Sequence, residues 1–505
     1  MMNKDKIVIV GGGTSGWMAA NMLAAELPSA AITVIETDAV PTIGVGEGST
    51  PFFKAFFERI GIAETEWMPA CHATYKTGIT FPGWSGDITP NSYFHPFYNE
   101  VDSDQVPVFF AACAAKLKGF DCHAHPDDFF VTGHLAQSNK APLHDVIKLD
   151  YGYHFDAGLL GEFLKKTAIG KGVKHLRDKV THVSLTGDDT IASIDTENSG
   201  QISATWYIDC TGFRRLLIES AMKQRFVSYR DSLLCDAAVA FSRSRNSKEP
   251  MRSSTLSTAV EQGWIWEIPL SHRTGTGLVY SERHNSQQDA IDALCSHLKQ
   301  QQPEQWKSLK WHPGRMQNSW VGNCVAIGLS QGFLEPLEAP MLNITQQSIS
   351  LFIESIKSDV LWPQEAFNQQ VAAMFEGTRD YVQAHYLLNQ RHDSSFWSAA
   401  RESLVVSEGL AALLQSWSKG MAIDGVLRHY PHLNFYLKTS WYCLLSGLDF
   451  YPKYPNGKQD LPAHSAHIIT KAQQNAMAIA NQFSDHGQTL HGHTQSAFLG
   501  ELSFA

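Results

Sequence analysis

Three glycines near the start of the chain have the spacing of a dinucleotide-binding loop. Gly11, Gly13 and Gly16 follow a β-branched run and precede an alanine-rich helical stretch. In such a loop the first glycine turns the chain, the second admits a pyrophosphate close to the backbone, and the third lets helix and strand pack. Thr14 and Ser15 stand where the helix would present unpaired N–H groups to phosphate.

Acidic residues after strands extend this pattern. A second apolar run, 32–35, ends in Glu36, where a carboxylate can take the ribose hydroxyls of a bound nucleotide. The predicted strand at 204–208 ends in Asp209 and is followed by Gly212, which suits a second cofactor contact. The sequence therefore predicts an ADP-containing cofactor.

A glycine-rich segment at 41–51 contains Gly46 and Glu47. One interpretation is a loop in which Ser49 or Thr50 caps a helix opened by Pro51, because proline suits the first helical position. The other is a strap that covers a ligand. The residues leave both interpretations open.

One lysine lies on an alternating strand. In the 75–81 segment, Lys76 shares a face with Gly78 and Thr80. On this pattern alone a solvent-facing lysine is favoured. Residues 85–145 then lose clear periodicity, which indicates an insertion rather than a sheet.

Further strands and helices follow. The strand at 264–269 carries Trp264 and Trp266 on one face, an arrangement typical of a core. A strand near 325 runs into a loop with Gly328 and two glutamates, of which Glu338 is the second. From 343 to about 446 the pattern is mostly helical. The chain then turns polar, and its histidines are expected at the surface: 464, 467, 486, 491 and 493.

The composition narrows the function classes. A length of 505 residues predicts two or three domains. The net charge of −10, without a basic run, argues against nucleic-acid binding. No apolar run is long enough to span a membrane. The eight cysteines show no C-x-x-C pair and are expected as reduced thiols. With a first strand starting at Lys6, no signal peptide is expected, and the predicted location is the cytoplasm.

Four stretches together resemble the flavin-dependent tryptophan halogenases: 11–16, Tyr75-Lys76, the W-x-W-x-I-P hexad at 264–269, and 322–338. The hexad is the most specific of them. The resemblance implies an α/β fold with a flavin-monooxygenase-like, Rossmann-type FAD module and a largely helical substrate module. The expected FAD module comprises 1–84 and 146–345, and the substrate module comprises 85–145 and 346–505.

The resemblance also implies a reaction. FADH2 from a separate, transiently bound flavin reductase reacts with O2, halide is oxidised to hypohalous acid, and this acid reaches an aromatic substrate. Lys76 would hold the hypohalous acid and Glu338 would assist. Trp264 and Trp266 would shield the flavin from the substrate. The substrate pocket would include His95, Phe97 and Trp441.

Two departures from the family pattern bear on specificity. The segment 424–440 is shorter than in the tryptophan halogenases and lacks the residues that grip a free amino acid, so indole or a related arene is expected as substrate. The family's Glu-Ser-Thr-Gly becomes Glu338-Ala339-Pro340-Met341. Pro340 and Met341 alter the halide site, and bromide is therefore expected over chloride.

Two alternatives remain open at this stage. One is an aromatic hydroxylase that uses the same flavin and O2 chemistry, and the other is a flavin-binding protein without halogenation activity. A small aromatic substrate is expected as ligand, with no metal. The oligomeric state stays open, a homodimer being one alternative.

Overall fold

The computed structural model describes residues 5–37, 46–86, 91–187, 189–246, 248–358, 363–455 and 457–491. The chain forms two compact units, each assembled from three segments. The first unit contains residues 1–73, 155–230 and 311–375, and the second contains 74–154, 231–310 and 376–505.

A six-stranded sheet organises the first unit. Its order is β21 (Trp320–Val321), β22 (Cys324–Ala326), β13 (Trp206–Asp209), β1 (Lys6–Val10), β2 (Ala31–Glu36) and β9 (Lys174–Arg177). The pairs from β22 to β9 are parallel, and β21 pairs antiparallel with β22. The parallel pair β1–β2 is connected through α1 (Thr14–Glu26), which is the expected dinucleotide-binding arrangement.

Helices and small sheets cover this core. α1 contacts β1 and β2 and packs against α6 (Ala157–Gly170), α8 (Met341–Lys357) and α2 (Phe52–Ile60). The remaining elements of the unit are β3 (Glu47–Gly48), α3 (Glu64–Ala70), β10 (Val180–Thr186), β11 (Thr190–Thr196), β12 (Gly200–Ile202), β14 (Phe226–Ser228), β20 (Gly314–Met316) and β23 (Gly332–Phe333). Ile191 and Ile194 of β11 pack with Val8 and Tyr207 of the main sheet.

A seven-stranded sheet organises the second unit. Its order is β19 (Lys307–Lys310), β15 (Ala237–Ser244), β18 (Arg273–Tyr280), β17 (Gly263–Pro269), β16 (Ser254–Val260), β5 (Gly78–Pro82) and β6 (Ser92–Pro96). Only the β16–β5 pair of this order is parallel. Next to it, β4 (Thr74–Lys76) pairs antiparallel with β8 (Gly152–Phe155).

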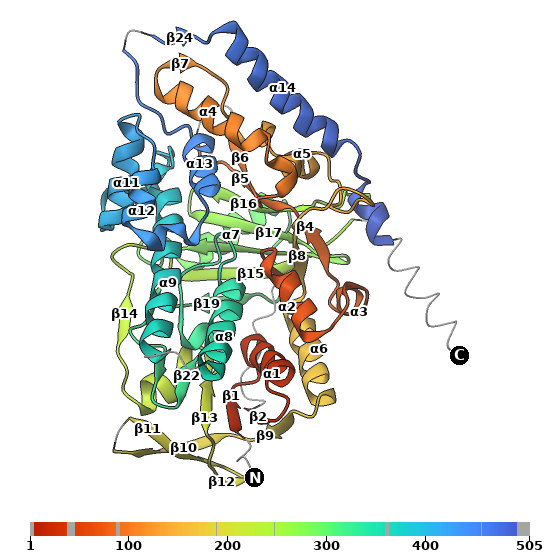
Figure 1. Ribbon diagram of the computed structural model, residues 1–505, viewed down its shortest axis with the longest axis vertical. Helices are drawn as coiled ribbons and strands as arrows, with labels where there is room; N and C mark the ends of the chain where they lie inside the picture. Colours follow the sequence, from red (N-terminus) through yellow and green to blue (C-terminus); the bar gives the residue numbers. More distant parts are fainter. Residues whose placement is uncertain are drawn as a thin grey trace. The chain divides into compact units, whose positions relative to one another are not determined.

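The helices of the second unit come mostly from the C-terminal part of the chain. They are α4 (Gln105–Leu117), α5 (Val131–Gln137), α7 (Gln287–Leu298), α10 (Ser395–Glu402), α11 (Glu408–Ser418), α12 (Asp424–His429), α13 (Lys438–Gly447) and α14 (Ala463–Ala480). α9 (Pro363–Leu388) begins in the first unit and ends in the second. Two short strands, β7 (Phe120–Asp121) and β24 (Gln459–Asp460), pair in parallel. The blue helix α14 lies beside the orange α4 and α5 (Figure 1).

The α/β fold class is confirmed, whereas the domain boundaries differ from the prediction. Residues 74–84, 146–154 and 231–310 belong to the second unit, and 346–375 belong to the first. The physical reason is strand pairing. The strands of segment 237–280 belong to the same hydrogen-bonded sheet as β5 and β6, so all of them fall in one compact unit. For the same reason 85–145 is not a plain insertion, because it supplies β6 to this sheet.

The polar C-terminal region contains the regular helix α14. Within the described residues, no helix combines the length and apolar character that a membrane crossing requires.

Candidate active site

The loop between β1 and α1 has the shape that a bound pyrophosphate needs. A Cβ atom at Gly11 would lie 2.1 Å from the Cys210 carbonyl oxygen, and one at Gly16 would lie 2.0 Å from the Gly11 carbonyl oxygen. Open space surrounds Gly13, which occupies the N-cap position of α1 without any side-chain cap. The N–H groups of Thr14 and Ser15 lie in the first turn of α1, and this end of the helix can therefore bind an anion. These residues fit the phosphates of FAD.

Glu36 lies against this loop. A Cβ atom at Gly12 would come within 1.7 Å of Glu36 Oε2, so the carboxylate lies directly beside the loop backbone. The other oxygen, Oε1, pairs with Lys165 and lies 2.8 Å from His175 Nε2. These two contacts fix the carboxylate at the end of β2. A ribose contact would use Oε2, and this role stays a proposal.

Asp209 organises the neighbouring loop through protein contacts. One of its carboxylate oxygens accepts from the Thr211 N–H and hydroxyl and from the Ser330 hydroxyl. The other accepts from the N–H groups of Leu217 and Ile218. Because both oxygens of this buried carboxylate bind protein donors, Asp209 is placed to shape the loop at Gly212, which has φ +65°.

A second glycine brings the 328–330 turn to the start of α1. Gly328 has φ +72°, and a Cβ atom there would lie 2.2 Å from Ser15 Oγ. The first unit thus gathers the predicted cofactor residues 11–16, Glu36, Asp209, Gly212 and Gly328.

The strap falls partly outside the described residues, which resume at 46. Gly46 has φ +87°, and Glu47 opens β3. Burial raises the pKa of Glu47 to about 7, and the Asp156 carboxylate adds to the shift. Pro51 occupies the N-cap position of α2, so the helix begins one residue later than expected.

A strained turn carries Glu338, which also belongs to the first unit. Glu338 and Ala339 have φ +67° and +50°, left-handed values that cost roughly 1–3 kcal/mol each in residues other than glycine. Glu338 is buried. The Ala339 N–H donates to the Pro336 carbonyl oxygen at 3.0 Å, and Pro340 then caps α8, whose first residue is Met341.

Lys76 belongs to the second unit and is fully buried, so the expectation of a solvent-facing lysine, drawn from the alternation alone, is wrong. Its Nζ lies 5.5 Å from the ring centre of Phe97. Burial lowers the pKa of the neighbouring His154 well below its ordinary value, and the Lys76 side chain adds to the shift.

A cluster of aromatic side chains contacts His95. His95, the predicted partner of Phe97 on β6, has its Nε2 3.5 Å from the Tyr381 hydroxyl. Tyr381 stacks on Tyr436 at 3.8 Å between ring centroids and meets the edge of Trp441 at 4.9 Å. Trp441 is fully buried and donates to the Leu433 carbonyl oxygen. Sequence reasoning missed Tyr381 and Tyr436, because neither belongs to a local motif.

The paired tryptophans lie on β17. Trp264 and Trp266 are both buried, with ring centroids 6.2 Å apart. Trp266 covers Gly277 of β18 so closely that a Cβ atom there would lie 2.1 Å from its ring. Because Gly277 has no side chain, the indole of Trp266 can lie directly against the backbone of β18.

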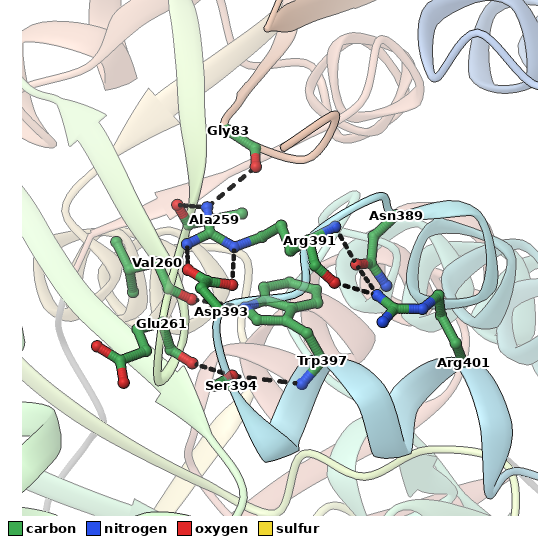
Figure 2. A network of polar contacts seen from close by, with 10 residues as sticks. All are labelled: Gly83, Ala259, Val260, Glu261, Asn389, Arg391, Asp393, Ser394, Trp397 and Arg401. Carbon is green, nitrogen blue, oxygen red and sulfur yellow. Dashed lines mark hydrogen bonds and ion pairs between the residues drawn. The ribbon is translucent and has the colours of Figure 1, made fainter. Parts of the chain in front are cut away.

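A polar network fixes the β16–β17 hairpin to the loop after α9. Figure 2 shows the Arg391 guanidinium between the carbonyl oxygens of Gly83 and Ala259, each at 3.1 Å, and its ion pair with Asp393. Trp397 Nε1 donates to the Val260 carbonyl oxygen at 2.8 Å. These bonds hold the hairpin that carries the paired tryptophans.

Two polar contacts involve side chains of the 424–440 segment. Lys438 Nζ donates to Asp424 at 2.7 Å, and His432 Nε2 lies 3.0 Å from the buried Asp380 carboxylate. The Ser440 carbonyl oxygen accepts from the Tyr381 hydroxyl at 3.0 Å. Lys438 and His432 of this segment are thus engaged with carboxylates of the protein.

Comparisons with known proteins agree with this architecture. The tryptophan halogenase family model matches residues 6–462. The chain is 34% identical over 493 residues to tryptophan 7-halogenase RebH of Lentzea aerocolonigenes, covering 90% of this chain and 91% of RebH. Solved structures of flavin-dependent halogenases are also similar to this chain. Tar14, described as a tryptophan C-6 flavin-dependent halogenase (chlorinase) from taromycin biosynthesis, has a TM-score of 0.83 at 29% identity, covering 97% of this chain and all of Tar14.

Xcc4156, a flavin-dependent halogenase from Xanthomonas campestris, has a TM-score of 0.86 at 28% identity, covering 97% of this chain and 98% of its own. The family match, the dinucleotide loop and the hexad strand support one assignment. The chain is an enzyme of the tryptophan halogenase family, the flavin-dependent halogenases.

Proposed function

We propose that this enzyme uses FADH2, O2 and halide to halogenate indole or a related electron-rich arene, with bromide favoured over chloride. The observation that carries the proposal is a fully buried lysine, Lys76, whose ammonium lies 5.5 Å from the ring centre of Phe97 in an aromatic region. A buried cation next to aromatic rings suits a reaction between an electron-rich ring and an electrophile held by hydrogen bonds.

Each site residue has a separate role in the proposed reaction. Bound reduced FAD supplies, with O2, the oxidising power that converts halide to hypohalous acid. Lys76 donates hydrogen bonds to the oxygen of that acid and holds the halogen over one ring carbon. Glu338 is a carboxylate suited to accept the proton that the ring loses. Trp264 and Trp266 exclude the arene from the flavin, while His95, Phe97 and Trp441 face the ring.

Product mass tests this proposal. The enzyme receives FADH2 from an added reductase, together with O2, bromide and indole. A bromine isotope doublet in the product supports halogenation. Addition of one oxygen atom would instead support the hydroxylase alternative, and unchanged indole would support the binding-protein alternative.

The halide preference follows from the Glu338 turn. An anion held by backbone depends on N–H groups, yet Ala339 donates its N–H to Pro336 and Pro340 has none. Each lost charge-assisted hydrogen bond weakens the site by about 1.5–3 kcal/mol. Chloride is more strongly hydrated and harder to oxidise than bromide, so a weakened site penalises chloride more. Tar14, by contrast, is described as a chlorinase.

We expect a competition assay at equal bromide and chloride concentrations to give about tenfold or more brominated product, matching the loss of one such hydrogen bond. Pro340→Thr restores an N–H at this position and should raise the chlorinated share. Equal or greater chlorination by the unmodified enzyme would contradict the argument. That outcome would indicate that N–H groups in the first turn of α8 hold the halide instead.

The reductant comes from a partner protein. The chain shows one dinucleotide loop, and FAD accounts for it. We therefore expect the purified enzyme with FAD to leave NADPH and NADH unconsumed, as read at 340 nm. Adding a flavin reductase should start consumption together with product formation, whereas rapid consumption without the reductase would contradict the prediction.

A further inference from the structure

The C-terminal segment, residues 463–491, lies beyond the end of the family match at 462. It is nevertheless anchored in the second unit. Lys140 Nζ donates to the carbonyl oxygens of Ala480 and Asn481 at 3.1 and 2.9 Å, at the end of α14. Phe483 is buried in a cluster with Val131 and Leu135 of α5. These contacts carry the chain from α14 into the interior.

His486, three residues after Phe483, is fully buried, although it was expected at the surface. Its Nε2 accepts the Tyr75 backbone N–H at 3.1 Å, and its Nδ1 faces the Arg252 carbonyl oxygen at 3.0 Å. A neutral ring with its hydrogen on Nδ1 satisfies both partners. Burial lowers the pKa of His486 to about 4, so the ring is neutral at physiological pH.

Hydrogen bonds to His486 and to Ser253 hold the backbone on both sides of Lys76. Before it, His486 accepts the Tyr75 N–H and is itself bound to Arg252. After it, the Ser253 carbonyl oxygen accepts the Thr77 N–H at 2.7 Å and the Thr77 hydroxyl at 2.8 Å. The Tyr75 and His486 rings also contact each other, with centroids 5.9 Å apart. The residues directly before and after Lys76 are therefore both fixed by hydrogen bonds.

We propose that His486 is a positioning residue for Lys76, so that the C-terminal segment forms part of the halogenation machinery. The proposal rests on the proposed function of Lys76. Removing the acceptor leaves the buried Tyr75 N–H without its partner, and β4 must shift to find another. A displacement of about 1 Å in a reacting group can cost about 100-fold in rate.

A pair of substitutions separates this role from a general structural one. His486→Asn places an amide near the Nδ1 position and keeps the bond to Arg252, but it does not reach the Tyr75 N–H. His486→Gln reaches it with its oxygen. His467→Asn, at an exposed histidine of the same segment, is the matched control. Product formation is measured beside amide hydrogen exchange in the peptide that spans 74–77.

For His486→Asn we expect a fall in kcat of about tenfold or more, with KM within about twofold and exchange of the 74–77 peptide about tenfold faster. Hypohalous acid trapped by an added scavenger should rise relative to halogenated product. His486→Gln should restore both readouts, and His467→Asn should match the unmodified enzyme.

Three results would overturn the proposal: unchanged kcat in His486→Asn, a fall in kcat without faster exchange at 74–77, or no rescue by His486→Gln in a folded protein. If His486→Asn does not fold, the Gln variant decides, because a folded Gln variant with low kcat and a loosened 74–77 peptide would contradict the acceptor role. Failure of the proposed function is recognised separately: the unmodified enzyme would then form no brominated product, and failure of the Lys76 role alone would leave Lys76→Ala with full halogenation.

Discussion

Lys76→Ala is expected to lower halogenation by about 100- to 1,000-fold, the usual cost of removing one donor that stabilises a developing charge. Hypohalous acid diffuses and reacts unselectively, so its productive use requires a group that holds it over the ring. Lys76 is fully buried beside Phe97, where its ammonium donates strong hydrogen bonds. The measurement is brominated product per enzyme with saturating indole.

Two controls make this result specific. Lys76→Met keeps an unbranched side chain one atom shorter and without charge, and it should lose activity to the same extent, which separates charge from packing. Lys118→Ala removes an exposed lysine of the same unit and should leave activity unchanged. FAD affinity should stay within about twofold in all three variants, because the dinucleotide loop belongs to the other unit. Near-normal product from Lys76→Ala would remove Lys76 from the mechanism.

Indole is expected to be a better substrate than free tryptophan by about 100-fold or more in kcat/KM, because burying unpaired charges costs several kcal/mol. Tryptophan carries an ammonium and a carboxylate. In the 424–440 segment, Lys438 pairs with Asp424 and His432 pairs with Asp380. Tyr381, Tyr436 and Trp441 form a cluster of aromatic rings, and we expect this cluster to favour an uncharged arene.

Two further substrates separate the charges. Tryptamine carries the ammonium alone, and indole-3-propionate carries the carboxylate alone. Each should fall between indole and tryptophan, and the one with the larger loss identifies the charge that the site accommodates less well. RebH is named a tryptophan 7-halogenase. A kcat/KM for tryptophan above that for indole would show that this chain grips the amino acid through residues outside 424–440.

Local sequence signals predicted the FAD-type unit well. The glycine spacing at 11–16 and the strand runs depend on neighbouring residues, and the structure has β1, α1, β2 and β13 where they were expected. The strand at 264–269 is also confirmed. Such elements are set by backbone conformation and hydrophobic periodicity over short stretches, which a single sequence displays directly.

Contacts between distant segments were not predictable in this way. The burial of Lys76 depends on β4 pairing with β8 and on anchors at 252–253 and His486. His486 stands in a polar stretch, and only the packing of α14 on α4 and α5 carries it inside. The compact units divide the chain differently from the expected modules for the same reason, since strand pairing joins 237–280 to β5 and β6.

The central claim is that Lys76 couples oxidised halogen to the aromatic ring. The most direct test is the ratio of bromoindole formed to O2 consumed, compared between the unmodified enzyme and Lys76→Ala. We expect O2 consumption to stay within about twofold while the ratio falls by about 100-fold or more, because the oxidant still forms but is no longer held. An unchanged ratio in Lys76→Ala would contradict the account.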